Sequence, residues 1–167
     1  EGLLPAGFNL VLVEYTLAPA ARLDAIVGEV RAAVSWIIAH AEELGGDPRR
    51  VFVAGHSAGG HLTAMAMHDA RVAGGVAISG IYDLEPIRLC YLNDRLGLDA
   101  AEAARNSPIF HLPAHAAPLV VAVGLDELPE LIRQSDEYAS AWHGRGLAGR
   151  YLPLPGHEHF SILEELA

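Results

Sequence analysis

The chain has 167 residues, of which 51% are hydrophobic and 19% are charged, and this balance excludes a disordered chain. Its length predicts one globular domain over residues 1–167. The 21 Asp and Glu residues outnumber the 11 Lys and Arg residues, which gives a formal net charge of -10. This charge argues against nucleic acid or an anionic membrane as a partner, because both bind clustered cations.

The first two elements expected along the chain are a buried strand and an amphipathic helix. Residues 9–15 are apolar almost throughout, which is typical of a strand covered on both faces. From Arg22 to Leu44 the apolar side chains recur at steps of three and four residues, which predicts a helix. The sequence Gly-Gly-Asp-Pro follows at 45–48, and such residues commonly end a helix.

The remaining elements alternate between strands and helices. They are strands at 51–55, 75–79, 118–124 and 149–154, helices at 62–67 and 129–144, and a last helix that begins near Phe160. Apolar strands that alternate with helices predict an α/β fold, with a mostly parallel sheet covered by helices on both faces.

Between the strand at 51–55 and the helix at 62–67 lies the sequence Gly55-His56-Ser57-Ala58-Gly59-Gly60-His61. A strand, the pattern G-x-S-x-G and a helix together are typical of a nucleophile elbow, whose sharp turn has no room for large neighbouring side chains. We therefore expect Ser57 to be a nucleophile. The N–H of Ala58, at the start of the helix, would contribute to an oxyanion hole.

A serine nucleophile needs a base and a carboxylate that orients the base, and in a parallel sheet both should follow later strands. Asp126 and Glu127 follow the strand at 118–124, and His157 and His159 follow the strand at 149–154. The order of serine, acid and histidine suits such a triad. Position along the chain leaves two acids and two histidines open.

Four further segments accompany the elbow. They are residues 15–19 (Tyr-Thr-Leu-Ala-Pro), 78–86 (Ile-Ser-Gly-Ile-Tyr-Asp-Leu-Glu-Pro), 133–135 (Arg-Gln-Ser) and 156–160 (Gly-His-Glu-His-Phe). In this order, over nearly the whole chain, they resemble the kynurenine formamidase (arylformamidase) and carboxylesterase group of the α/β-hydrolase superfamily. The resemblance implies an α/β-hydrolase fold.

The resemblance also implies roles for particular residues. The family's nucleophile falls on Ser57, and its catalytic histidine, which precedes a Phe, falls on His159. The family's acid falls on Glu127, three residues after Gly124. Asp126 stays the alternative acid, because Asp is the commoner acid of such triads and a shift of one residue in a loop is easy.

Two residues are candidates for substrate binding. Tyr82 follows the strand at 75–79 and is expected near the mouth of the pocket, where it would either contact substrate or pack against the protein. His56 flanks Ser57, where an orienting or packing role is favoured over proton transfer. The segment at about 81–117 stands where this fold inserts a cap, and its shortness favours a small acyl group over a long lipid chain. No spacing of His, Cys and Asp suits a metal ion, so neither a metal nor a cofactor is expected.

The family's oxyanion hole takes further N–H groups from a His-Gly-Gly motif on an earlier strand, and no such motif stands upstream of Ser57. That strand normally lies between those expected at 9–15 and 51–55. The chain begins at Glu1, without an initiator methionine. We therefore expect a chain that is truncated at both ends and lacks the N-terminal strands, in which 9–15 and 51–55 do not pair directly.

These residues predict a serine hydrolase that cleaves a small carboxylic ester or an N-formyl aryl amide through an acyl-enzyme on Ser57. The alternative is a non-catalytic α/β-hydrolase-fold binding protein that lacks a complete oxyanion hole. The expected partner is a small-molecule ester or formamide, not nucleic acid or a membrane, and a homodimer is compatible with the sequence. Cys90 is the only cysteine, so no disulfide can form within the chain. We also expect neither a secretory signal nor a membrane span. The expected location is therefore the cytoplasm.

Overall fold

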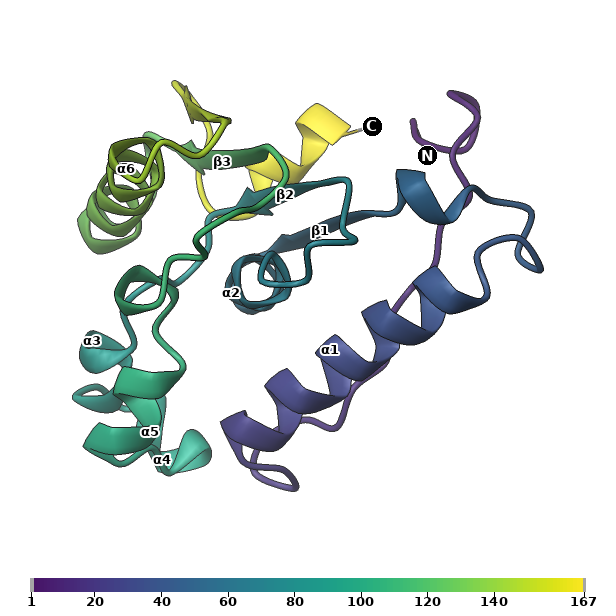
Figure 1. Cartoon of the computed structure of the whole chain (residues 1–167). Coiled ribbons are helices and arrows are strands. Elements are labelled where there is room, and N and C mark those ends of the chain that lie inside the picture. The colour runs from purple at the N-terminus through teal and green to yellow at the C-terminus, as the bar shows by residue number, and fades with distance from the viewer. Residues whose placement is uncertain (1, 167) are drawn as a thin grey trace.

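The computed structural model describes residues 2–166. Its centre is a sheet of four parallel strands in the spatial order β1-β2-β3-β4, formed by Phe52–His56, Gly74–Ile78, Leu119–Gly124 and Gly149–Leu154 (Figure 1). The expected parallel α/β sheet is confirmed. Each of these strands has bounds within one residue of the expected ones, because apolar runs between turn residues mark buried strands clearly.

Helices connect the strands. The α-helices are α1 (Leu23–Ala39), α2 (Ala58–Ala66), α3 (Glu85–Arg88), α4 (Asn93–Leu96), α5 (Ala100–Arg105) and α6 (Pro129–Gly144), and the 3-10 helices are η1 (Pro48–Arg50), η2 (Pro108–Phe110) and η3 (Ser161–Leu166). α6 has the expected bounds, whereas α1 ends before the expected Leu44 and the last segment is a 3-10 helix. None of the helices in the described part of the chain is long and apolar enough to cross a membrane.

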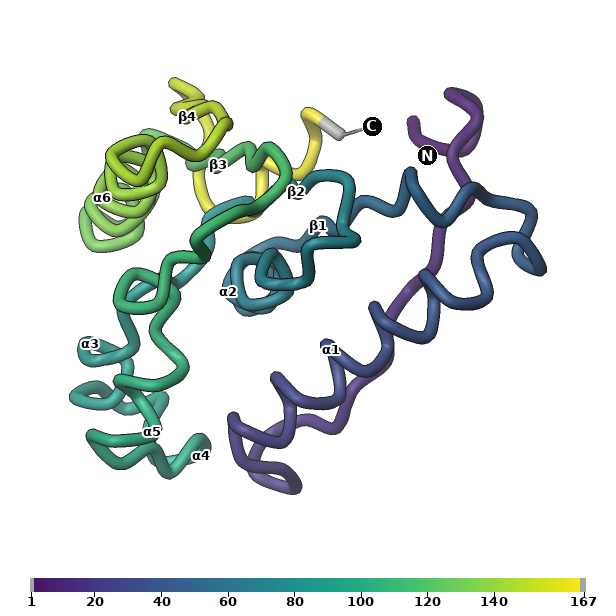
Figure 2. The backbone as a smooth tube through the Cα atoms, viewed as in Figure 1, coloured from purple at the N-terminus to yellow at the C-terminus, as the bar shows by residue number. Residues whose placement is uncertain are grey.

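The two faces of the sheet are covered unequally. On one face, α1, α2 and α6 pack against strand residues such as Ala77 and Val121, and this contact forms the largest core cluster. η3 lies on the other face (Figures 1 and 2), and its Ile162 packs against Ile78 and Ala122. Helices thus lie on both faces, but within residues 2–166 the second face carries a single short 3-10 helix.

The expected strand at 9–15 does not form. The segment runs beside α1 (Figures 1 and 2), where the Asn9 side chain donates to the carbonyl of Leu44 and the carboxylate of Glu29 accepts the N–H of Thr16. A strand exists only beside a partner strand, and among the described residues β1 pairs with β2 alone. The prediction of a strand there is wrong. The prediction that it does not pair directly with residues 51–55 is confirmed.

The segment at 81–117 links β2 to β3 through α3, α4, α5 and η2. Leu84, Leu98 and Ala103 of this segment share a second core cluster with α1 and α2. The buried carboxylate of Glu102 also pairs with Arg22, directly before α1. These contacts fix the segment against the helical side of the molecule, and its role as a cap stays a prediction.

Candidate active site

Ser57 occupies the sharp turn between β1 and α2. Its backbone has φ 57° and ψ -116°, a conformation that a residue other than glycine rarely adopts, and its N–H donates to the carbonyl of Ile78 over 2.8 Å. The turn is so tight that a Cβ on Gly55 would lie 2.3 Å from the carbonyl oxygen of Gly59. The geometry is therefore that of the strand, elbow and helix expected from the sequence.

Three side chains form a hydrogen-bonded chain that begins at Ser57. His159 Nε2 lies 3.0 Å from Ser57 Oγ, and His159 Nδ1 lies 2.6 Å from Glu127 Oε2. An Nδ1–H that donates to the carboxylate leaves Nε2 free to accept the proton of the serine hydroxyl. The Glu127 side chain is 0% exposed, whereas that of His159 is 25% exposed, so the carboxylate is shielded while the imidazole reaches solvent.

Two further donors fix the carboxylate of Glu127. Ser79 Oγ donates to Glu127 Oε1 over 2.5 Å, and the N–H of Gly124 donates to the same oxygen over 2.9 Å. Ser79 is fully buried at the end of β2, next to the strand that precedes Glu127. Sequence reasoning gives Ser79 no role. Ser79 follows the carboxyl end of β2, the strand beside the one that precedes Glu127, and this position could have predicted that it contacts the acid.

The alternative acid and the alternative histidine make no hydrogen bond to Ser57 or His159. Asp126 is exposed, its side chain makes no hydrogen bond to any described residue, and its N–H donates to the carbonyl of His157. His157 Nε2 lies 3.2 Å from Glu165. The structure therefore brings Glu127 and His159 to Ser57, and it does not bring Asp126 or His157 there.

The two candidate substrate-binding residues differ in what they contact. His56 Nε2 lies 2.7 Å from the backbone carbonyl oxygen of His159, so its ring is engaged with the loop that carries that histidine. Tyr82 is 1% exposed, and its ring stacks on that of Tyr138 with centroids 4.2 Å apart. The expectation that Tyr82 lies near a pocket mouth is not met, because the apolar ring is more stable in the core, against α6.

Other histidines serve packing. His61 Nε2 lies 2.7 Å from the carbonyl oxygen of Asn106, and burial lowers the pKa of His61 to about 4, so that its ring is neutral at pH 7. Within residues 2–166, no three His, Cys, Asp or Glu side chains are grouped so that they could hold a metal ion.

One candidate oxyanion donor lies beside Ser57. Ala58 is the first residue of α2, where an N–H has no acceptor inside the helix, and it has no backbone acceptor elsewhere in the described chain. The positive end of the helix dipole lies at the same place. A negative oxygen next to Ser57 would therefore find one backbone donor there.

Comparison with known proteins identifies the fold family of the chain. Residues 5–116 match the family described as alpha/beta hydrolase fold. The kynurenine formamidase of Danio rerio is 33% identical over 177 residues, which cover 98% of this chain and 59% of that protein. The carboxylesterase NlhH of Mycobacterium tuberculosis is 46% identical over 66 residues, which cover 40% of this chain and 21% of that protein.

Solved structures show the same fold. A putative thioesterase from Silicibacter sp. has a TM-score of 0.82 and 30% sequence identity, over 99% of this chain and 62% of that chain. The esterase of Pyrobaculum calidifontis has a TM-score of 0.80 at 22% identity, over 92% of this chain and 58% of that chain. The chain thus spans about three fifths of the length of these proteins and of the formamidase. It belongs to the family of proteins with the alpha/beta hydrolase fold.

Proposed function

We propose that this protein is a serine hydrolase in which Ser57 is the nucleophile, His159 the general base and Glu127 the residue that orients the base. The observation that carries this proposal is the continuous chain of hydrogen bonds from Ser57 Oγ through both ring nitrogens of His159 to the buried Glu127 carboxylate. Nucleophile, base and orienting carboxylate in this geometry define a triad irrespective of sequence position.

In the first half of the reaction, Ser57 Oγ attacks the carbonyl carbon of the substrate, and its proton passes to His159 Nε2. The imidazolium that forms is stabilised by the Glu127 carboxylate, which Ser79 and Gly124 hold in place. Collapse of the tetrahedral intermediate breaks the bond to the leaving alcohol or amine, which takes the proton from His159. An acyl group remains on Ser57.

In the second half, a water molecule gives a proton to His159 Nε2 and attacks the acyl group. The intermediate then releases the carboxylic acid, and the proton returns to Ser57 Oγ. The N–H of Ala58 stabilises the negative oxygen of both intermediates. Each further donor in an oxyanion hole contributes about 2.7–4 kcal/mol to the stability of the transition state, so the rate depends strongly on what completes this site.

We propose a small carboxylic ester or an N-formyl aryl amide as the substrate. Relatives named kynurenine formamidase and carboxylesterase support these two classes, and both reactions would use the same three side chains. We also propose a cytoplasmic location, because a chain with a single cysteine, Cys90, suits a reducing compartment.

A fluorophosphonate probe tests the mechanism directly, because it reacts with activated serine hydroxyls. We expect the probe to label Ser57 in the native chain, and to label neither the Ser57→Ala variant nor, at a comparable rate, the His159→Gln variant. A folded chain with no labelling above that of Ser57→Ala would contradict the proposal. Turnover of p-nitrophenyl acetate against N-formylkynurenine then distinguishes the two substrate classes.

A second candidate function is a binding protein with the same fold and no catalysis. The observation that favours it is that, among residues 2–166, the N–H of Ala58 is the one oxyanion donor assigned beside Ser57. The same labelling experiment separates the two functions: a binding protein retains its affinity for an ester or formamide after Ser57→Ala and never labels.

A further inference from the structure

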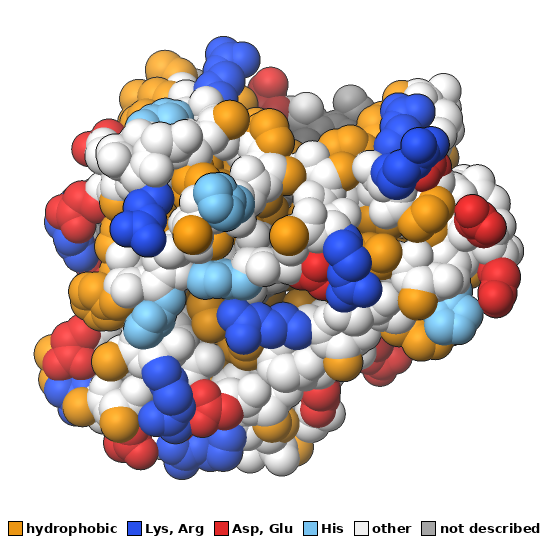
Figure 3. All heavy atoms as spheres, viewed as in Figure 1, with side chains coloured by type: hydrophobic (Ala, Val, Ile, Leu, Met, Phe, Trp, Pro, Cys, Tyr) orange, Lys and Arg blue, Asp and Glu red, His pale blue; other side chains and the backbone are white. Residues whose placement is uncertain are grey.

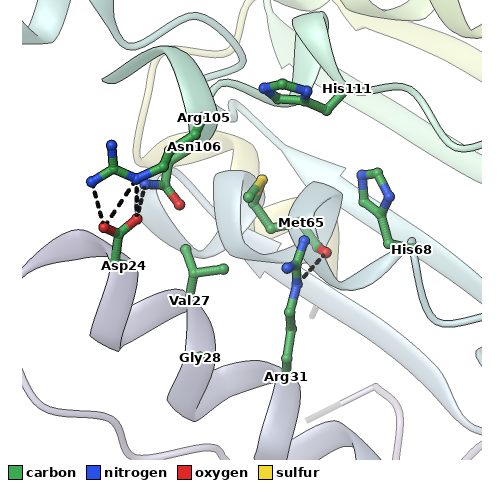
Figure 4. A pocket seen from close by; sticks show the side chains of 9 residues that line it. All are labelled: Asp24, Val27, Gly28, Arg31, Met65, His68, Arg105, Asn106 and His111. Carbon is green, nitrogen blue, oxygen red and sulfur yellow. Dashed lines mark hydrogen bonds and ion pairs between the residues drawn. The ribbon is translucent and has the colours of Figure 1, made fainter. Parts of the chain in front are cut away.

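A cavity of about 380 Å³ lies away from Ser57, between α1, the C-terminal end of α2 and the residues after α5 (Figure 4). Its floor is apolar, because Met65 and Val27 lie there and are each 4% exposed. A second hollow of about 410 Å³ shares Arg31 and His68 with it and continues along α1. None of the residues that line either hollow belongs to the proposed catalytic triad.

The cavity gathers basic side chains in an acidic protein. Two arginines and two histidines line it against the single carboxylate of Asp24, although acidic residues outnumber basic ones 21 to 11 over the chain. Arg and His side chains are seen together on this face in Figure 3. Such a local excess of positive charge attracts anions.

The one carboxylate is already neutralised. Arg105 donates to both oxygens of Asp24 over 2.6–3.1 Å, and Asn106 donates to one of them over 2.6 Å. These hydrogen bonds, with that of Arg105 the largest cause, hold the pKa of Asp24 below its usual value. Asp24 and Arg105 therefore cancel each other, and the charge of Arg31 is left over.

Arg31 is held with its terminal nitrogens available. Its Nε donates to the carbonyl of Met65 over 3.1 Å, which fixes the guanidinium above the apolar floor (Figure 4). Its other nitrogens have no acceptor among the described residues. His68 likewise makes no side-chain hydrogen bond there, and His111 uses only Nε2, on the carbonyl of Ala104. Burial, followed by the positive charges of Arg31 and His111, lowers the pKa of His68.

We propose that this cavity binds a small organic anion. Its carboxylate or phosphate would lie between Arg31, His68 and His111, and its apolar part would rest on Met65 and Val27. A guanidinium offers paired N–H donors to either oxyanion, and imidazole N–H groups add further hydrogen bonds. The volume suits a ligand of one aromatic ring with one acidic group. This inference is independent of the hydrolase proposal, because the two sites share no residue.

Calorimetric titration of the full chain tests the site with phenyl phosphate, benzoate, inorganic phosphate and uncharged benzyl alcohol. We expect saturable binding of phenyl phosphate or benzoate, weakened roughly tenfold or more by Arg31→Gln, because that change removes a charge-assisted pair of hydrogen bonds. Arg49→Gln removes the same charge from a side chain that is 88% exposed on η1 and should leave the affinity unchanged. The ratio of the affinities for phenyl phosphate and benzoate shows whether the site prefers a phosphate or a carboxylate. Weaker binding of inorganic phosphate than of phenyl phosphate shows the contribution of the apolar floor.

The pH dependence provides a second test. Arg31 keeps its charge, Arg105 stays paired with Asp24, and Asp69 of the adjoining hollow is paired with Arg71. His68, whose pKa burial lowers from its usual value of about 6.5, is thus the group whose protonation would change, and the affinity for benzoate should rise as the pH falls from about 6.5 to 5. His68→Gln should reduce that rise and keep the fold, because the His68 side chain makes no hydrogen bond to any described residue. Equal effects of Arg31→Gln and Arg49→Gln, equal binding of benzyl alcohol, or no saturable binding would each overturn the proposal.

Discussion

His56 Nε2 donates a hydrogen bond to the backbone carbonyl of His159 over 2.7 Å, so the residue before the proposed nucleophile holds the loop that carries the proposed base. The two rings also lie 4.4 Å apart, centroid to centroid. Burial lowers the pKa of His56, which favours a neutral ring beside His159, the proposed general base. His56 is in this view a positioning residue.

His56→Ala should therefore lower kcat by up to about tenfold with little change in KM, because one hydrogen bond that orients the base is lost and no substrate contact changes. His56→Gln keeps a side-chain donor and should recover part of the loss. His143→Ala is the matched control, since His143 is exposed and hydrogen bonds to the carbonyl of Gly149 at the start of β4. A rise in KM at constant kcat would instead make His56 a substrate-binding residue.

Glu127 and Asp126 provide the sharpest test of the acid. Glu127→Gln should lower kcat/KM by roughly a thousandfold to ten-thousandfold, because an amide in place of the carboxylate favours the wrong tautomer of His159. Asp126→Asn should leave kcat/KM within a factor of about two, because an exposed side chain without a partner contributes little. Steady-state kinetics of both variants on one ester show which of the two residues is the acid. A larger loss from Asp126→Asn would reverse the assignment.

The elbow makes a prediction about stability that is independent of catalysis. A Cβ on Gly55 would lie 2.3 Å from the backbone oxygen of Gly59, and neither backbone segment can move without distorting the turn. Gly55→Ala should therefore lower the free energy of unfolding by about 3 kcal/mol or more. Gly59→Ala is the control, because a Cβ there meets no atom within 4 Å. Denaturant titration compares the two, and equal stabilities would contradict the close approach of Gly55 to Gly59.

The sequence predicts those features of the fold that depend on patterns among neighbouring residues. The four paired strands, α6 and the elbow follow from runs of apolar residues and from small residues at turns. Position beyond the carboxyl ends of parallel strands predicts that Ser57 meets an acid and a histidine, and only the resemblance to the family selects Glu127 over Asp126 and His159 over His157.

The rest depends on contacts between distant segments. Residues 9–15 have the composition of a strand, but a strand needs a hydrogen-bonded partner strand. Among residues 2–166 the segment has no such partner. Tyr82 lies near the end of a strand, yet its ring turns into the core against Tyr138. The contact of His56 with the His159 carbonyl depends on how two loops 103 residues apart approach each other, which no local pattern encodes.

His61 makes the stability of the fold depend on pH. Its folded pKa of about 4 lies below the value of about 6.5 for an exposed histidine, so below pH 6.5 the unfolded chain binds a proton that the folded chain does not. The contribution of His61 is thus fully present above pH 6.5 and is lost as the pH falls toward 4, by about 3 kcal/mol over this window.

His61→Gln removes this titration while it keeps a side-chain donor for the carbonyl of Asn106. We expect the variant to be less stable than the native chain at pH 7.5 and to lose less stability between pH 6.5 and pH 4.5, as measured by urea unfolding. His115→Gln alters an exposed histidine and should leave the pH dependence unchanged. If the native chain and His61→Gln lose the same stability over this range, His61 is not protonated on unfolding, and the burial that lowers its pKa is absent in solution.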